Sequence, residues 1–164
     1  MPNYYPLAAQ NEWQYKMKDG SSYSNKVTAA DGHVFTMHNS AANTSSKVKL
    51  EGDTVYTDAL QAGNFEKWVD NNLKTGDTWE IKFTANGLDS ILILTVKETG
   101  MSKEVNGKNY DNVLFIEAEN KMVINGSLMS LNFFTQYYYA DGVGLVLTTS
   151  SAGDEHVLVS CTLN

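Results

Sequence analysis

The sequence contains no arginine. All twelve basic residues are lysines, nineteen residues are acidic, and the formal net charge is -7. Arginine is the side chain best suited to phosphate and guanine, because its planar guanidinium donates two parallel hydrogen bonds. Nucleic-acid-binding domains also carry a basic surface, which an acidic chain lacks. The composition therefore excludes nucleic acid as a partner.

Cysteine and proline are nearly absent as well. The single cysteine, Cys161, excludes an intrachain disulfide. It lies on the same face of a strand-like run as Val157 and Val159, which predicts a buried and unreactive thiol. The two prolines are Pro2 and Pro6, so no backbone N–H is missing from the strand ladders of the remaining chain.

Long apolar runs are also missing. The longest, Ile91–Leu94, has the length of a strand, whereas a membrane-spanning helix needs roughly 20 apolar residues. We therefore expect no membrane span. Residues Met1–Tyr5 lack the basic and apolar regions of a signal peptide. We expect either a cytosolic protein or a chain that begins after a removed signal.

The remaining composition is that of one globular domain over residues 1–164. Hydrophobic residues make up 42% of the chain and charged residues 19%, which is typical of a folded protein rather than a disordered one. Nine tyrosines, six phenylalanines and three tryptophans favour the half-buried surfaces of β-sheets.

Turn dipeptides recur along the chain between runs that alternate apolar and polar residues, as in residues 13–17 and 79–83. Gly, Asn and Asp tolerate positive φ, so this pattern predicts a series of β-hairpins. Residues 90–97 and 112–118 are apolar on both faces, which predicts central strands. We predict a mainly β fold of about ten antiparallel strands in a strongly curved sheet or partly open barrel. The turn dipeptides are Asp19-Gly20, Asp31-Gly32, Gly52-Asp53, Asn86-Gly87, Asn106-Gly107, Asn125-Gly126, Asp141-Gly142 and Gly153-Asp154.

One segment shows a helical period instead. Five positions, four of them apolar, are spaced i, i+3, i+4, i+7 and i+8, with Asn64 as the N-cap and Gly76 as the stop signal. We predict one α-helix over about residues 65–74, docked on the sheet or closing a barrel end. The residues of the stripe are Phe65, Trp68, Val69, Asn72 and Leu73.

No catalytic, cofactor or metal motif is found. His33 and His38 are five residues apart in a strand, so they point to opposite faces and cannot chelate one metal. Glu117 and Glu119 share one face of a strand, whereas glycoside hydrolysis needs two carboxylates on either side of the bond. We predict a protein without catalytic residues, cofactor or metal.

An excess of aromatic surface is the best indication of a binding site. Tyr137 and Tyr139 share one face of the strand over residues 131–140, and one ten-residue helix is too small to cover every apolar strand face. The uncovered part is then a cleft. The predicted ligand-binding residues are Trp68, Leu73, Phe133, Tyr137 and Tyr139.

Five segments resemble small envelope lipoproteins of Bacteroidetes and other bacteria. They are residues 4–7 (YYPL), 11–15 (NEWQY), 75–79 (TGDTW), 106–113 (NGKNYDNV) and 138–146 (YYADGVGLV). The resemblance implies a curved antiparallel sheet wrapped about a helix, and it brings no catalytic residues. The sequence departs from the pattern at Gln10, where a glycine is expected, and in having no lipobox cysteine.

These observations predict a non-enzymatic domain, periplasmic or envelope-associated rather than cytoplasmic, that binds an apolar or amphipathic ligand in a cleft of the sheet. The expected partner is a small apolar molecule or another envelope protein. Two other hypotheses are a protein-interaction module that uses a sheet edge and a carbohydrate-active hydrolase that uses Glu117 or Glu119.

Overall fold

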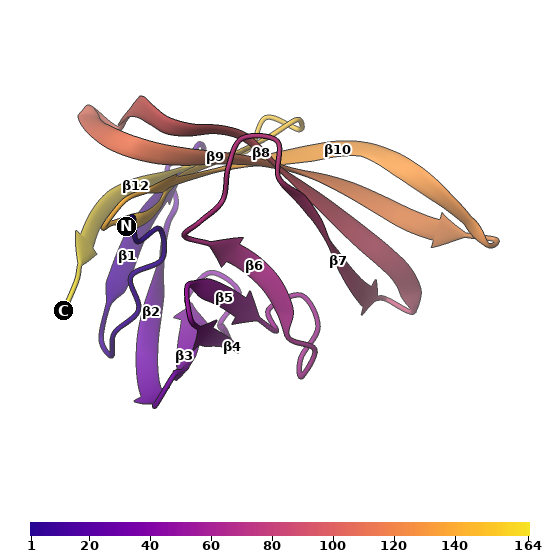
Figure 1. Cartoon of the computed structure of the whole chain (residues 1–164), viewed down its shortest axis with the longest axis horizontal. Helices are drawn as coiled ribbons and strands as arrows, with labels where there is room; N and C mark the ends of the chain where they lie inside the picture. The colour runs from indigo at the N-terminus through magenta and orange to yellow at the C-terminus, as the bar shows by residue number, and fades with distance from the viewer.

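Twelve antiparallel strands form one sheet that curves until its two edge strands, β6 and β7, lie beside each other (Figure 1). The computed structural model describes residues 1–164. Every sequential pair of strands is hydrogen-bonded except β6 and β7, and β1 pairs with β12. The strands are β1 (Glu12–Met17), β2 (Ser22–Asp31), β3 (Val34–Asn39), β4 (Thr44–Glu51), β5 (Thr54–Thr57), β6 (Glu66–Asp70), β7 (Thr78–Ala85), β8 (Leu88–Val105), β9 (Lys108–Ile124), β10 (Ser127–Ala140), β11 (Gly144–Ser150) and β12 (Glu155–Thr162).

The predicted all-antiparallel, barrel-like sheet is confirmed, but the predicted helix over residues 65–74 is wrong. That segment contains strand β6 and the turn that follows it, and the chain has no helix at all. Val55 pairs with Val69 and Tyr56 with Lys67, so Trp68 is the extra residue of a β-bulge. A bulge breaks the strict alternation of a strand, and here it produced a spacing that imitates a helical stripe. No helix is therefore available to cross a membrane.

The core lies on the concave face of the sheet. A row of fully buried valines crosses β2, β4, β5 and β6, and they lie opposite the buried aliphatic side chains of β8 and β9. Burying each of these side chains stabilises the fold by about 1.5–3 kcal/mol. The valines are Val27, Val48, Val55 and Val69.

The N-terminal segment runs across one end of the barrel. The backbone N–H of Tyr4 donates to Oδ1 of Asn71 at 3.0 Å, and the N–H of Asn3 donates to Oδ1 of Asp141 at 2.8 Å. Gly142 adds a backbone bond to Asn3 at 2.8 Å. The segment thereby joins the β6–β7 turn to the β10–β11 turn, and it brings Tyr4 into the core, where it is 3% exposed.

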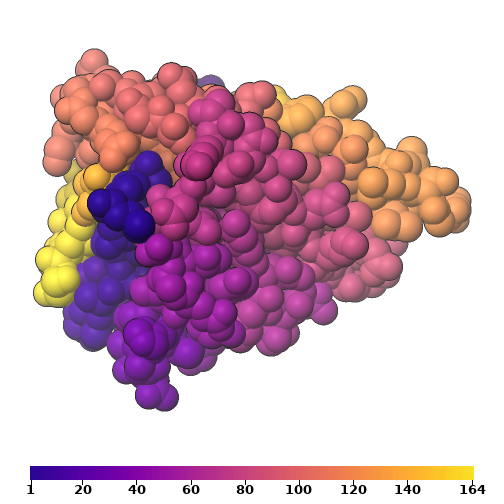
Figure 2. Space-filling model, in the orientation of Figure 1, coloured from indigo at the N-terminus to yellow at the C-terminus, as the bar shows by residue number.

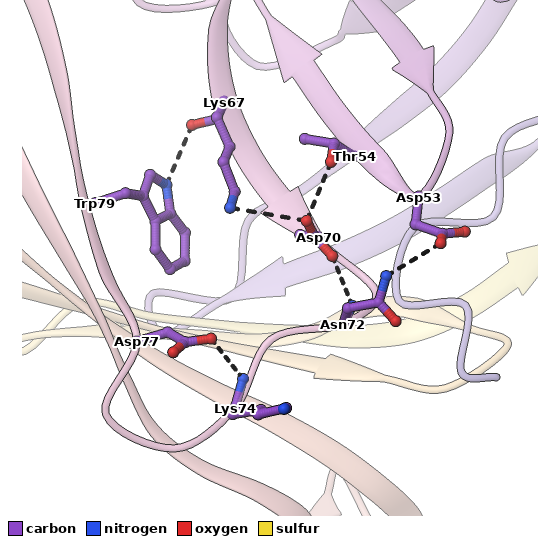
Figure 3. A network of polar contacts seen from close by, with 8 residues as sticks. All are labelled: Asp53, Thr54, Lys67, Asp70, Asn72, Lys74, Asp77 and Trp79. Atoms are coloured by element: carbon purple, nitrogen blue, oxygen red, sulfur yellow. Dashed lines mark hydrogen bonds and ion pairs between the residues drawn. The ribbon is translucent and has the colours of Figure 1, made fainter.

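Side chains bridge the seam between the two edge strands. Trp79 Nε1 on β7 donates to the carbonyl of Lys67 on β6 at 3.2 Å, and the Lys67 ammonium lies 5.2 Å from the centre of the Trp79 ring (Figure 3). From the β5–β6 loop, Asn64 Nδ2 donates to the carbonyl of Lys82 at 3.1 Å, and Gln61 Oε1 accepts from the N–H of Thr84 at 2.9 Å. Side-chain bonds thus replace the missing backbone ladder.

The β9–β10 hairpin extends beyond the barrel as a protruding lobe (Figures 1 and 2). Its aliphatic side chains Leu128, Met129 and Leu131 are 46–50% exposed. No charged residue occurs between Met122 and Ala140. The pairing of β10 with β11 stops at Thr135 and Phe134 still bonds to Ser151, so residues 127–133 of β10 have a free edge.

Of two further predictions, the turn at Gly142 is confirmed and the burial of Cys161 is wrong. Gly142 has a φ of 74°, as the hairpin signal at Asp141-Gly142 requires. The expected burial of Cys161 is wrong, because its side chain is exposed. Cys161 lies next to the last residue of β12, where the strand runs past the core and Leu163 is 37% exposed.

Candidate ligand-binding cavity

A cavity of about 500 Å³ lies inside the barrel, between strands β2–β6 on one side and β10–β11 on the other. A smaller hollow of about 40 Å³ adjoins the large cavity. Five of the eight residues that line the smaller hollow also line the large cavity, among them Tyr5 and Tyr139. The residues that line the large cavity are Tyr5, Asn25, Met37, Asn39, Thr44, Ser45, Ser46, Val48, Thr57, Asp58, Ala59, Leu60, Ala62, Trp68, Tyr137, Tyr139 and Leu145.

One wall of the cavity is aromatic. The bulge in β6 turns Trp68 inward, and its Nε1 donates to the hydroxyl of Tyr139 at 2.6 Å. The Trp68 ring also meets Tyr137 edge to face at 5.2 Å between ring centres. Such pairs contribute about 0.5–1.5 kcal/mol beyond the area that they bury. The contacts hold the edge strand β6 against the C-terminal end of β10.

Alternation along β10 decides which tyrosines reach the cavity. Tyr137 pairs with Ile116 and Tyr139 with Leu114, both buried residues of the concave face. Tyr138 points to the convex face, where its ring stacks on Phe115 at 4.5 Å. Two of the three consecutive tyrosines therefore contribute to the cavity.

Tyr5 completes the aromatic wall from the N-terminal segment. Its ring stacks on Tyr139 at 6.1 Å and meets Trp13 edge to face at 6.5 Å. Burial raises the pKa of Tyr5 and of Tyr137 to about 12 and raises the pKa of Tyr139 well above its usual value. These hydroxyls are uncharged at neutral pH, so the wall offers rings and neutral hydrogen-bonding groups.

The opposite wall is polar. Asn25, Asn39, Ser46 and Thr57 come from four consecutive strands, and each lies on the concave face beside the valine row. Asn39 Nδ2 donates to Oδ1 of Asn25 at 2.8 Å. Asp58 is the one charged residue of the lining. The cavity thus combines aromatic rings on one side with amides and hydroxyls on the other.

The structure brings together three of the five predicted ligand-binding residues. Trp68, Tyr137 and Tyr139 line the cavity together. Leu73 lies in the turn after β6 and packs against the core outside the cavity. Phe133 lies on β10 where the ladder with β9 is interrupted, and it is not in the lining either.

Sequence reasoning missed Tyr5 and the whole polar wall. The segment Pro2–Leu7 has neither a strand pattern nor a helix pattern, so nothing in it indicated that Tyr5 reaches the cavity. The polar wall consists of ordinary Ser, Thr and Asn residues in alternating strands. Nothing in a single sequence distinguishes such residues when they face a cavity from those that face water.

Glu117 and Glu119 lie on the convex face of β9, away from the cavity. Glu117 accepts from Gln136 Nε2 at 3.0 Å, and Glu119 accepts from Ser130 Oγ at 3.1 Å and lies 3.7 Å from the Lys121 ammonium. Carboxylates side by side on one open surface do not have the arrangement of a glycosidase pair, which faces across a cleft.

Comparison with known proteins finds relatives by structure alone. No family model and no curated protein matches the sequence. A lipoprotein candidate from Parabacteroides distasonis matches with a TM-score of 0.57 and 12% identity, over 98% of this chain and 99% of that one. A candidate exported protein with a YmcC-like fold from Bacteroides fragilis matches with a TM-score of 0.59 and 10% identity, over 99% and 100%. The chain therefore has the fold of these Bacteroidetes proteins. The sequence resemblance predicted this likeness and the curved antiparallel sheet, but the helix that it implied is absent.

Proposed function

We propose that the chain is a non-enzymatic binding domain that takes a small apolar or amphipathic molecule into the barrel cavity. The observation that supports this most is the cavity itself. Its volume of about 500 Å³ falls within the range of small-molecule sites, and aromatic side chains line it beside a few polar groups.

We further propose an envelope location. The support is the description of the similar structures, one as a lipoprotein and the other as an exported protein. The structural similarity establishes a shared fold, and the envelope location is carried over to this chain by analogy. The partner would be the small ligand or another envelope protein.

Binding is favoured over hydrolysis for a specific reason. Glu117 and Glu119 lie outside the cavity lining and are engaged by Gln136 and Ser130. The one carboxylate in the lining, Asp58, stands alone there, whereas glycoside hydrolysis uses two.

The test uses an uncharged apolar fluorescent probe, N-phenyl-1-naphthylamine. We expect it to bind with micromolar affinity and with increased fluorescence, because it leaves water for an aromatic wall. Tyr137→Ala removes part of that wall and should weaken binding roughly tenfold. Tyr138→Ala is the matched control, since this neighbour faces the convex surface. Equal effects of the two variants, or no probe binding, would refute the proposal.

A second candidate function is protein binding through a sheet edge. The free edge of β10 over residues 127–133 supports it, together with the exposed Leu128, Met129 and Leu131. Exposed strand edges with apolar side chains are typical sites for pairing with another chain. Leu128→Lys should abolish such a contact and leave probe binding unchanged.

A further inference from the structure

The cavity is graded from an apolar floor to a polar rim. Tyr139, Met37 and Val48 are buried at the floor, whereas Thr44 and Ser45 at the rim are exposed. An amphipathic ligand would satisfy this gradient with its apolar part on the rings and its polar head at the rim. The chemistry of the rim then decides which head group fits.

The lining contains no cation. Neither lysine nor histidine occurs among its seventeen residues, and the chain has no arginine. The one charged lining residue is Asp58, whose Oδ1 accepts from the N–H of Lys47 at 2.7 Å and whose Oδ2 accepts from the N–H of Gly63 at 3.0 Å. A carboxylate head group would find no counter-charge there and would be repelled by Asp58.

Several uncharged polar groups are open to the cavity. Ser46 Oγ makes no hydrogen bond within the protein, and neither does Asn25 Nδ2, because Asn25 is engaged through Oδ1 alone. These groups provide both donors and acceptors, as a hydroxylated head group requires.

From these observations we infer that the cavity selects an uncharged, polyhydroxylated head group on an apolar body, that is, a neutral glycoside, and discriminates against carboxylate amphiphiles. The inference rests on the proposed binding function. The hydroxyls of the sugar pair with the amide and hydroxyl side chains towards the rim, and the apolar body packs on the aromatic rings. The aromatic and polar walls lie opposite each other and supply both kinds of contact.

The experiment compares three amphiphiles with the same eight-carbon chain below their micelle concentrations. They are octyl β-glucoside, octanoate and tetraethylene glycol monooctyl ether, each used to displace N-phenyl-1-naphthylamine at pH 7. We expect the glucoside to displace the probe at a concentration roughly tenfold lower than octanoate, because the carboxylate loses solvation without gaining a partner. The ether has an uncharged head with one hydroxyl, so it should fall between the two.

Two variants test the cause of the selectivity. Ser46→Ala removes one open hydroxyl and should weaken the glucoside roughly three- to tenfold while leaving the ether unchanged. Thr44→Lys places a cation at the exposed rim and should strengthen octanoate roughly two- to fivefold. Both positions are surface-accessible, so the fold should tolerate the changes.

The outcomes separate this inference from the proposed function. Octanoate that binds as tightly as the glucoside, or a Ser46→Ala variant with unchanged glucoside affinity, overturns the inference and leaves the binding function standing. Failure of the probe to bind the unmodified protein removes the binding function itself. A gain for octanoate in Thr44→Lys supports the charge argument, and no gain contradicts it.

Discussion

The indole of Trp68 donates a hydrogen bond to the hydroxyl of Tyr139 at 2.6 Å and thereby ties the edge strand β6 to the C-terminal end of β10. Seventy-one positions separate the two residues in the chain. Tyr139 is 2% exposed, so its hydroxyl cannot easily turn to water when this partner is lost.

We expect Trp68→Phe and Tyr139→Phe each to lower the free energy of unfolding by about 1–3 kcal/mol. Each change leaves the other polar group without its partner, so the double variant should lose less than the sum of the two. Urea unfolding of the four proteins measures this coupling. Strictly additive losses would mean that the hydrogen bond contributes nothing to stability.

Two glycines with different constraints lie at the β10–β11 junction, Gly142 in the turn and Gly144 at the start of β11. Gly142 has a φ of 74° with open space around its Cα, whereas Gly144 has a φ of 107° and an added Cβ would lie 3.1 Å from Trp13 Nε1. Gly142→Val should cost about 1–3 kcal/mol through backbone strain. Gly144→Ala should cost more than Gly142→Ala, because it also displaces the indole that donates to the Val143 carbonyl at 2.7 Å.

Thermal unfolding of the two alanine variants makes this comparison directly. Gly142→Asn is the control, since asparagine tolerates positive φ better than other residues with a side chain. It should be milder than Gly142→Val. Equal losses at positions 142 and 144 would show that the contact with Trp13 has no energetic role.

The sequence predicted the fold class because turn chemistry and alternation are local signals. Strands with strong alternation, such as Trp79–Phe83, were placed correctly within β7. Strands β2, β5 and β6 were not recognised. Strand β2 is mostly polar, β5 and β6 are short, and a bulge in β6 hides its period at Trp68. Bulges depend on the pairing partner, so a single chain segment does not reveal them.

The candidate site was half predictable for a related reason. Tyr137 and Tyr139 were found because they alternate on one strand, which is a local property. Tyr5 and Ser46 come close to them only when the sheet curls and the N-terminal segment crosses its end. That closure depends on contacts between distant strands, which no local pattern encodes.

Alkaline pH should destabilise the protein through its buried tyrosines. Burial holds the pKa of Tyr5 at about 12 in the folded state, above the usual value of 10.0. Below pH 10 both states keep the proton and stability is unaffected. As pH rises from 10 towards 12, the unfolded state ionises first, so this contribution to stability is lost over that window.

We expect the urea midpoint to fall steadily above pH 10, with tyrosinate absorbance rising as the protein unfolds. Tyr5→Phe removes one of the groups concerned and should make the fall less steep. Burial also raises the pKa of Tyr139 and Tyr137, so a smaller fall should remain in this variant. A urea midpoint that stays constant to pH 12 would contradict the raised pKa values of these buried hydroxyls.

Opening of the barrel between β6 and β7 should also open the cavity, because one loop takes part in both. The β5–β6 loop lines the cavity rim with Ala59, Leu60 and Ala62, and the same loop reaches across the seam through Gln61 and Asn64. A few side-chain hydrogen bonds are weaker than a continuous backbone ladder, so the barrel should open here first.

We therefore predict that Gln61→Ala combined with Asn64→Ala speeds amide exchange in β6 and β7 and leaves exchange in β1 and β12 unchanged. Hydrogen–deuterium exchange with mass spectrometry resolves these segments. The control is Asn72→Ala, whose side chain donates to Asp53 at 3.1 Å on the same side of the seam (Figure 3). Because the loop also forms the rim, the double variant should release the bound probe faster, whereas Asn72→Ala should not. Exchange that rises uniformly in all strands would show that the barrel opens as one unit and that the seam is not its weak point.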